Sequence, residues 1–255
     1  MPHDLITIPC LSDNYAYLLH DQNSGETACI DVPEAGPIKA ALAEHGWTLS
    51  QVWLTHHHWD HVDGLADLLA DHPASVIGAK ADAHRLPELN VEVGEGDTIK
   101  LGNLEAQIID VSGHTIGHIA FYVPGAKAAF TADSLMALGC GRLFEGTPAQ
   151  MWDSMQKMMQ WPAETTICSG HEYTASNAKF ALTVDPENTD LISRAQEIET
   201  ARSAGRPTVP SQLSTELKTN PFLRPADPGI RAQLGMQTAS DAEVFAEIRK
   251  RKDTF

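Results

Sequence analysis

The sequence is poor in positive charge and has no long apolar run, and each absence argues against a class of protein. Its 255 residues contain 18 Lys and Arg against 34 Asp and Glu, a net charge of −16. Binding a nucleic acid requires a contiguous basic surface, so we expect no nucleic-acid partner. No apolar run approaches the roughly 18 residues that cross a bilayer, and no basic segment precedes a signal-peptide core. We therefore expect a cytoplasmic protein with no membrane partner.

The sequence also lacks the usual motifs of thiol chemistry and serine catalysis. Its four cysteines are widely separated and form no Cys-x-x-Cys pair: Cys10, Cys29, Cys140 and Cys168. This spacing indicates neither a disulfide framework nor a thiolate zinc site. There is no Gly-x-Ser-x-Gly nucleophile elbow either. A hydrolytic activity, if present, has to come from another kind of centre.

A dense group of metal-ligand residues follows the apolar, β-prone run Val52–Thr55. If the extended backbone continues, His56 and His58 project to the same side, because strand side chains alternate. His57 then points away. Clustered imidazoles after a buried strand are typical of a metal site, whereas isolated histidines usually decorate a polar loop.

The same segment continues with Asp60 and His61, where the chain turns into the helical pattern of Val62–Asp71. These two side chains can face a second point a few ångströms from the first. One short loop could therefore serve two metal ions. Four ligands do not complete two coordination shells, so this hypothesis requires further His and Asp residues at other strand ends.

Three later strand-to-loop junctions provide them. The strand-like run before Ser112 leads into a glycine-rich loop with His114 and His118, and two other apolar runs end at Asp133 and at His171. A chance distribution would not place ligand chemistry so regularly after strands.

This combination resembles the metallo-β-lactamase superfamily over residues 1–172. The resemblance implies an α/β fold, the αββα sandwich, carrying a binuclear site. It implies these ligands: His56, His58 and His114 for the first metal, Asp60, His61 and His171 for the second, and Asp133 bridging both. We expect two divalent ions, zinc first, with iron or manganese as alternatives. A metal-bridging hydroxide, with Asp60 and Asp133 as the catalytic carboxylates, would be nucleophilic at neutral pH.

Five further stretches resemble the glyoxalase II (hydroxyacylglutathione hydrolase) family: Leu11–Leu18, Cys140–Thr147, His171–Thr174, Asn220–Arg224 and Arg249–Asp253. The resemblance implies hydrolysis of S-2-hydroxyacylglutathione thioesters, such as S-D-lactoylglutathione to D-lactate and glutathione, in the second step of methylglyoxal detoxification. It implies that the substrate is bound by Arg142, Phe144, Tyr173, Arg249 and Lys252. Many family members carry tyrosine at position 144, so Phe144 keeps the ring and loses one hydrogen bond, worth about 0.5–1.5 kcal/mol.

The sequence divides into two parts by its pattern. Strand-like and helical segments alternate over residues 1–172, which we expect to form the catalytic domain, and helical segments dominate residues 173–255, which we expect to form an α-helical substrate-binding domain. Within the second part, Ser211–Glu216 is typical of a capped helix start. No heptad pattern indicates a partner helix, so we expect a monomer.

Some assignments stay open at the level of sequence. Asp31 or Asp110 could orient a ligand imidazole from a strand end. Two related activities compete with the glutathione thioesterase: a single-iron persulfide dioxygenase, and a lactonase or β-lactamase. A non-catalytic metal module is the third alternative, although structural zinc sites are usually closed and tetrahedral.

Overall fold

The computed structural model describes residues 2–255, which divide into two compact units. Unit 1 comprises residues 2–110 and Ile116–Ala132, and unit 2 comprises Val111–Thr115 and Asp133–Phe255. The short segment Val111–Thr115 lies in the first half of the sequence but belongs to unit 2. Each unit therefore holds its own share of the predicted metal ligands.

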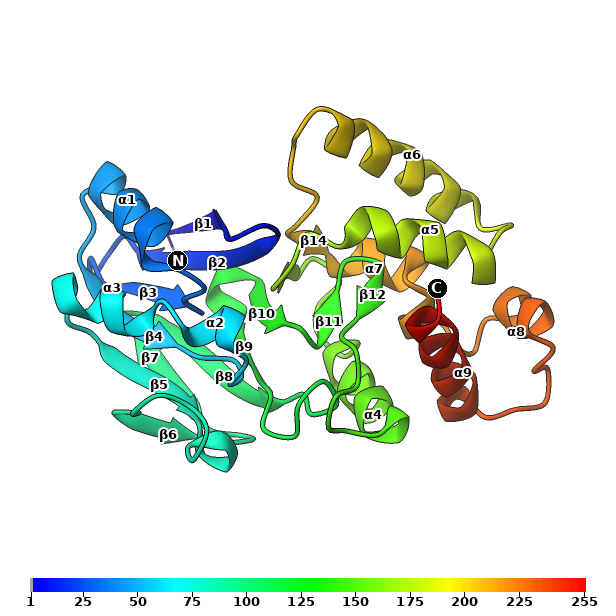
Figure 1. Ribbon diagram of the computed structural model, residues 1–255, viewed down its shortest axis with the longest axis horizontal. Helices are drawn as coiled ribbons and strands as arrows, with labels where there is room; N and C mark the ends of the chain where they lie inside the picture. Colours follow the sequence, from blue (N-terminus) through cyan, green and yellow to red (C-terminus); the bar gives the residue numbers. More distant parts are fainter. Residues whose placement is uncertain (1) are drawn as a thin grey trace. The chain divides into compact units, whose positions relative to one another are not determined.

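Unit 1 contains a mixed sheet of six strands in sequential order (Figure 1). Its strands are β1 (His3–Cys10), β2 (Asn14–Asp21), β3 (Thr27–Ile30), β4 (Leu49–Trp53), β5 (Ser75–Ala79) and β6 (Val91–Val93). The first three pair antiparallel, and β3 to β6 pair in parallel. Parallel strands bury both faces, and β3 and β5 are accordingly almost wholly apolar.

A second, antiparallel sheet in unit 1 has the order β7-β8-β9-β10. Its strands are β7 (Thr98–Leu101), β8 (Leu104–Asp110), β9 (Ile119–Val123) and β10 (Ala128–Ala132). Aromatic rings join the two sheets: Trp53 of β4 stacks on Phe121 of β9 at 5.1 Å between centroids. Tyr17 of β2 meets the edge of Phe130 of β10 at 5.7 Å. These contacts build the core of the predicted sandwich.

The helices of unit 1 include one that differs from the sequence prediction. They are α1 (Ala35–His45), α2 (Trp59–Val62), α3 (Leu65–Asp71) and the 3-10 turns η1 (Lys80–Asp82) and η2 (Pro124–Ala126). The predicted single helix over Val62–Asp71 is interrupted at Gly64. A Cβ there would lie 2.7 Å from the backbone of Glu34, so the chain passes too closely for any other residue. The ligand residues Asp60 and His61 consequently lie on the separate short helix α2.

Unit 2 is mainly helical. It holds the hairpin β11 (Leu135–Met136) and β12 (Gly139–Cys140), the antiparallel pair β13 (Thr166–Ser169) and β14 (Ser211–Gln212), and the following helices: α4 (Pro148–Met158), α5 (Thr174–Val184), α6 (Thr189–Ser203), α7 (Leu213–Thr219), η3 (Pro221–Leu223), α8 (Pro228–Leu234) and α9 (Asp241–Asp253). A buried cluster that includes Leu138, Ala178 and Leu191 joins the hairpin to α5 and α6.

Local capping explains where several of these helices begin. Thr147 and Gln150 form a capping box at the start of α4, and Ser240 and Glu243 form another at α9. The cap predicted in Ser211–Glu216 is wrong in detail, because α7 begins there without a side-chain cap and Glu216 is buried. Over residues 2–255, none of the helices is long and apolar enough to span a membrane.

Candidate metal centre and substrate-binding residues

In unit 1, the buried carboxylate of Asp31 organises the ligand loop that follows β4. Its Oδ1 accepts the backbone N–H of Thr55 at 2.9 Å, and its Oδ2 accepts the Thr55 hydroxyl at 2.8 Å. The same Oδ2 lies 2.8 Å from Nδ1 of His61. Asp31 thus performs the orienting role that the sequence left open between two aspartates. Although Asp31 lies close to His56 and His61, its oxygens are occupied by these bonds, so we treat it as an orienting residue.

These hydrogen bonds also decide which ring nitrogens can bind a metal. A carboxylate only accepts, so Nδ1 of His61 carries the proton and Nε2 carries the lone pair. The Thr55 hydroxyl donates to Asp31 and therefore accepts from Nδ1 of His56, 3.0 Å away. Nε2 of His56 then carries the lone pair that could bind a metal, and it lies 3.2 Å from Nδ1 of His58. A buried aspartate thus sets two imidazoles, one of them through a threonine.

Asp60, the remaining predicted ligand of this loop, is held by a residue to which the sequence analysis gave no role. Asn14, at the start of β2, donates from Nδ2 to the Asp60 carbonyl at 3.0 Å and to its Oδ2 at 3.1 Å. Oδ2 of Asp60 lies 4.0 Å from Nε2 of His61. Asn14 belongs to the Leu11–Leu18 stretch that resembles the glyoxalase II family, but the sequence did not indicate that its side chain would contact Asp60.

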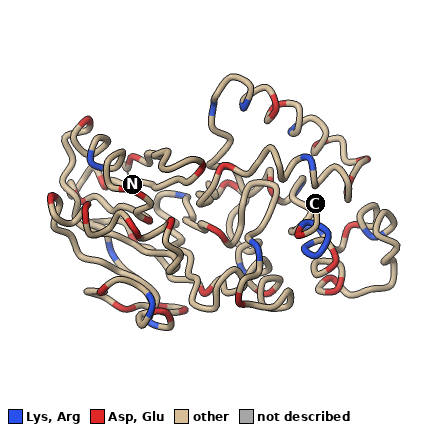
Figure 2. Tube along the Cα trace, in the orientation of Figure 1, with Lys and Arg blue, Asp and Glu red and all other residues tan. Residues whose placement is uncertain are grey.

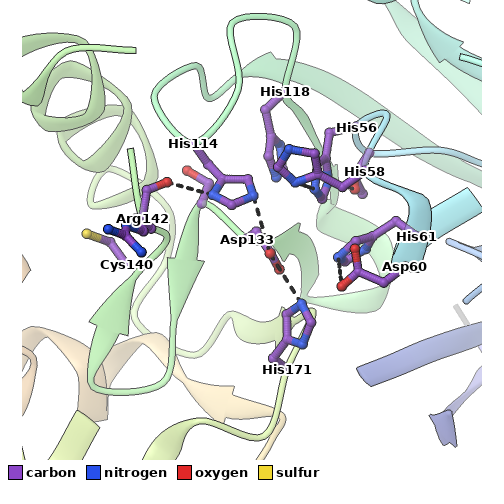
Figure 3. Close-up of polar contacts among 12 residues, drawn as sticks. His56, His58, Asp60, His61, His114, His118, Asp133, Cys140, Arg142 and His171 are labelled. Atoms are coloured by element: carbon purple, nitrogen blue, oxygen red, sulfur yellow. Dashed lines mark hydrogen bonds and ion pairs between the residues drawn. The ribbon is translucent and has the colours of Figure 1, made fainter. Parts of the chain in front are cut away.

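In unit 2, two predicted histidine ligands converge on one carboxylate oxygen of a third, Asp133. Oδ2 of Asp133 lies 3.4 Å from Nε2 of His114 and 3.3 Å from Nε2 of His171 (Figure 3). Nδ1 of His114 lies 2.7 Å from the carbonyl of Arg142, and a carbonyl only accepts, so this ring carries its proton on Nδ1. The lone pair on Nε2 therefore faces an anionic oxygen. A cation between such acceptors removes their repulsion, and the imidazole–carboxylate donor set suits a divalent metal ion.

Two other histidines near the ligands have different partners. Nδ1 of His57 lies 2.8 Å from Oδ2 of the buried Asp82. The His57 ring also meets the edge of the His58 ring at 5.0 Å between centroids, so it does not point away from His58 as alternation predicted. His118 is wholly buried and stacks on the His56 ring, with centroids 4.6 Å apart and planes 11° apart. Both histidines pack against the ligand loop in unit 1.

The five predicted substrate residues all belong to unit 2, and four of them are at least partly exposed. The side chain of Arg142 is 64% exposed, and its guanidinium lies 5.8 Å from the centre of the Phe144 ring. Phe144 meets the His114 ring edge-on at 5.3 Å. Tyr173 stacks on His171 with planes 5° apart and centroids 4.7 Å apart. Two aromatic rings therefore contact metal-ligand imidazoles directly.

The two cations on α9 differ in their surroundings. Arg249 is only 6% exposed, and it donates to the carbonyl of Cys140 at 2.8 Å and to Asp253 at 2.9 Å. Nζ of Lys252 lies over the rings of Phe180 and Phe255, 5.4 Å and 5.3 Å from their respective centroids. Partial burial, and then the charge of Arg249, lower the pKa of Lys252 below its usual value. Figure 2 shows the basic residues gathered in the last turns of this helix.

Asp253 is a second residue that the sequence reasoning did not use. Its Oδ1 lies 2.9 Å from Nη2 of Arg249 and 3.9 Å from Nε of Arg142. The carboxylate therefore links two of the predicted substrate-binding cations. Its position four residues after Arg249 on a helix is a recognisable signal for such a pair.

Comparison with known proteins agrees with this arrangement. The family model of the metallo-beta-lactamase superfamily matches residues 18–171, and the one described as hydroxyacylglutathione hydrolase C-terminus matches residues 172–255. Proteins named hydroxyacylglutathione hydrolase from Ruegeria pomeroyi and Roseobacter denitrificans are each 64% identical to this chain, over 100% of both sequences. The crystal structure of ETHE1 from Myxococcus xanthus has a TM-score of 0.67 at 24% identity, covering 98% of this chain and 90% of that one, which shows a shared fold.

The facing sheets and the histidine–aspartate groups thus define a metallohydrolase of the metallo-β-lactamase superfamily. Within that superfamily, the identity over the full length shows that the chain belongs to the hydroxyacylglutathione hydrolase family. The fold class and the family predicted from the sequence are both confirmed.

Proposed function

We propose that this protein hydrolyses S-2-hydroxyacylglutathione thioesters, converting S-D-lactoylglutathione to D-lactate and glutathione in the second step of methylglyoxal detoxification. The observation that carries the proposal is the 64% identity to hydroxyacylglutathione hydrolases over the whole chain. In the reaction, water adds oxygen to the acyl carbon, the C–S bond breaks, and the sulfur leaves as a thiolate that takes up a proton.

We propose that the predicted ligands hold two divalent metal ions: His56, His58 and His114 for one, Asp60, His61 and His171 for the other, with Asp133 shared. Support comes from within each unit, where hydrogen bonds set the ring nitrogens and two imidazoles meet one Asp133 oxygen. Bound metal ions would supply Lewis acidity towards the carbonyl and a nucleophilic water at neutral pH. We infer zinc, with iron or manganese as alternatives.

We propose that the chain's own residues provide the affinity for the glutathione moiety. This substrate has net negative charge, and an acidic protein repels it at long range, so local cations are required. Arg142 offers an exposed guanidinium and Lys252 an ammonium, while Tyr173 and Phe144 offer ring faces beside the ligand imidazoles. Arg249 belongs to the same set, and Asp253 would exchange part of its pairing for a substrate carboxylate.

We further propose that residues 1–172 form the catalytic domain and residues 173–255 the substrate-binding domain of a cytoplasmic monomer. The two family models meet at residues 171 and 172, which supports this boundary.

Burial raises the pKa of the thiols of Cys10 and Cys140 to about 11, which suits cysteines that stay reduced.

Two competing activities are less well supported. A persulfide dioxygenase would use one iron and would leave the second ligand set without a role. A lactonase or β-lactamase would share a two-metal site but would give no reason for the cations on α9. The match of residues 172–255 to the hydroxyacylglutathione hydrolase C-terminus favours the thioesterase over both.

The test is the turnover of the purified, metal-loaded protein on four substrates: S-D-lactoylglutathione, a simple lactone, a β-lactam and glutathione persulfide. We expect loss of the thioester absorbance with kcat/KM in the range common for enzymes, about 10⁴–10⁸ M⁻¹s⁻¹, and slower turnover of the other three. Faster turnover of the lactone, the β-lactam or the persulfide would overturn the substrate assignment.

The lowered pKa of Lys252 predicts a specific pH dependence of substrate binding. The ammonium loses its proton as pH rises through this lowered pKa, so the attraction to an anionic substrate is present below it and lost above it. We expect KM to rise on the alkaline side at a lower pH than an ordinary lysine would give. Lys252→Arg keeps its charge over this range and should remove the rise. Parallel KM–pH profiles for both proteins would contradict the assignment.

A further inference from the structure

We propose that the C-terminal helices position the metal ligands, in addition to binding substrate, by fixing the β11–β12 hairpin with the side chains of Asn177, Glu216 and Asn220. The inference deepens the proposed function and rests on it for its kinetic consequences. It assigns a role to the Asn220–Arg224 stretch, which the sequence marked only as a family resemblance. All the residues involved belong to unit 2.

Side chains bond a backbone group of every residue in the hairpin. Asn220 donates from Nδ2 to the carbonyls of Met136 and Gly139, at 3.1 and 3.0 Å. Asn177 donates to the carbonyl of Ala137 at 3.0 Å. The remaining bonds come from three other residues: Ser169 donates to Leu135 at 3.3 Å, Glu216 accepts the N–H of Leu138 at 2.8 Å, and Arg249 donates to Cys140 at 2.8 Å.

The side chains that bond the hairpin form a buried network that fixes its position. Glu216 is wholly buried, as is Asn220, and Oε2 of Glu216 also receives Nδ2 of Asn220 at 3.1 Å. The charge of Glu216 is balanced by Arg194, which also donates to the hydroxyl of Thr219 at 2.6 Å. A buried network with its groups satisfied holds one geometry, because any shift leaves polar groups without partners.

The tip of the hairpin is anchored in the same region by apolar packing. Leu138 has a φ of +56°, a conformation that favours glycine, yet its side chain is wholly buried. It packs in the cluster with Ala178 and Ala181 of α5 and Leu191 of α6. The burial of this leucine side chain offsets the strain of its left-handed backbone. The strained residue is therefore held by its contacts with the helices.

The two ends of the hairpin lead directly to metal ligands. Asp133 lies two residues before β11, and the N–H of Gly141, just after β12, bonds the carbonyl of Ser134 at 3.0 Å. A Cβ at Gly141 would lie 1.8 Å from the Asp133 carbonyl and 3.0 Å from Nδ1 of His114, so only glycine allows this approach. The next residue, Arg142, accepts the hydrogen bond that orients His114. The position of the hairpin thus sets both Asp133 and the His114 ring.

The decisive comparison is between Asn220→Ala and Asn188→Ala in the full-length protein. Both remove an asparagine amide from the helical region, but Asn188 caps α6 and bonds the Lys218 carbonyl, with no contact to the hairpin. The zinc dissociation constant of the metal-free proteins is measured by competition with a chromogenic chelator, alongside the melting temperature. We expect both variants to melt at a lower temperature. Asn220→Ala should bind zinc about tenfold more weakly, a typical loss for a residue that orients ligands, and Asn188→Ala within about twofold of wild type.

Two further variants keep the test decisive if Asn220→Ala does not fold. Asn177→Ala removes a single hairpin bond, and we expect about threefold weaker zinc binding, below the roughly tenfold loss typical of residues that bond a metal ligand directly. Glu216→Gln retains an acceptor for the Leu138 N–H and should bind zinc better than Glu216→Ala. Equal zinc affinity of the wild type, Asn220→Ala and Asn177→Ala would overturn the proposal. Because zinc binding is measured without substrate, a wild-type protein that lacks thioesterase activity would refute the proposed function and leave this comparison intact.

Discussion

Asp133→Asn is expected to lower kcat by roughly a thousandfold with little change in fold. The carboxylate that His114 and His171 both approach would become a neutral amide. Where its NH₂ group faces an imidazole, it would donate a hydrogen bond to the ring's lone pair. The site would lose one negative charge and its shared ligand. Loss of metal-based charge stabilisation costs several kcal/mol, and about 4 kcal/mol corresponds to this factor. Steady-state kinetics and metal analysis of the same sample measure the effect.

Asp153→Asn is the matched control. It makes the same chemical change at an exposed position on α4 in the same unit. It should keep wild-type kcat and metal content. If Asp133→Asn retained more than about a tenth of the wild-type kcat with two metals bound, the role of Asp133 as the shared ligand would be wrong, since a tenfold loss is only about 1.4 kcal/mol.

Asp31→Asn should have the second largest effect, and it should act through two histidines at once. The asparagine would present an NH₂ group to at least one of the donors that Asp31 now accepts: the N–H and hydroxyl of Thr55 and Nδ1 of His61. We expect metal affinity to fall about a hundredfold, at the upper end for residues that orient ligands. Stability should fall by about 3 kcal/mol, because buried donors lose their charged partner. Chelator competition and thermal melting measure the two effects separately.

Thr55→Val separates the two routes by which Asp31 acts. Valine removes the hydroxyl that links Asp31 to His56 but leaves the bond from His61 to Asp31 in place. We expect about a tenfold loss of metal affinity, between the wild type and Asp31→Asn. If Thr55→Val and Asp31→Asn weakened metal binding equally, His61 would not depend on Asp31 for its orientation.

The residues that could be predicted from the sequence are those whose chemistry repeats at strand ends. His56, His58 and Asp60 stand together after an apolar run. Strand alternation did not place His57 correctly, because its ring contacts the His58 ring while its Nδ1 lies beside Asp82. The superfamily and the family also followed from local motifs. These signals can be recognised without the structure because they depend on residues that are neighbours along the chain and on where strands end.

Apart from Asp31, which was one of two candidates, the supporting residues could not be predicted, because their partners are distant in the sequence. Asn14 reaches Asp60 across 46 positions, and Glu216 reaches Leu138 across 78. The pattern at Ser211–Glu216 suggested a helix cap for Glu216, but its side chain turns inwards to the hairpin instead. Gly64 shows the same limit, since only the close passage of Glu34 explains the break between α2 and α3. Such features depend on tertiary packing, which overrides local propensity.

The central claim, that this chain is a thioesterase that uses two bound metal ions, is tested most directly by titrating the metal-free protein with zinc while following hydrolysis of S-D-lactoylglutathione. The account predicts that activity rises until two equivalents per chain are bound and then stays constant. It also predicts that His171→Ala, which removes a ligand of the second metal only, saturates at one equivalent with little activity. Full activity at a single equivalent, in the wild type or in that variant, would contradict it.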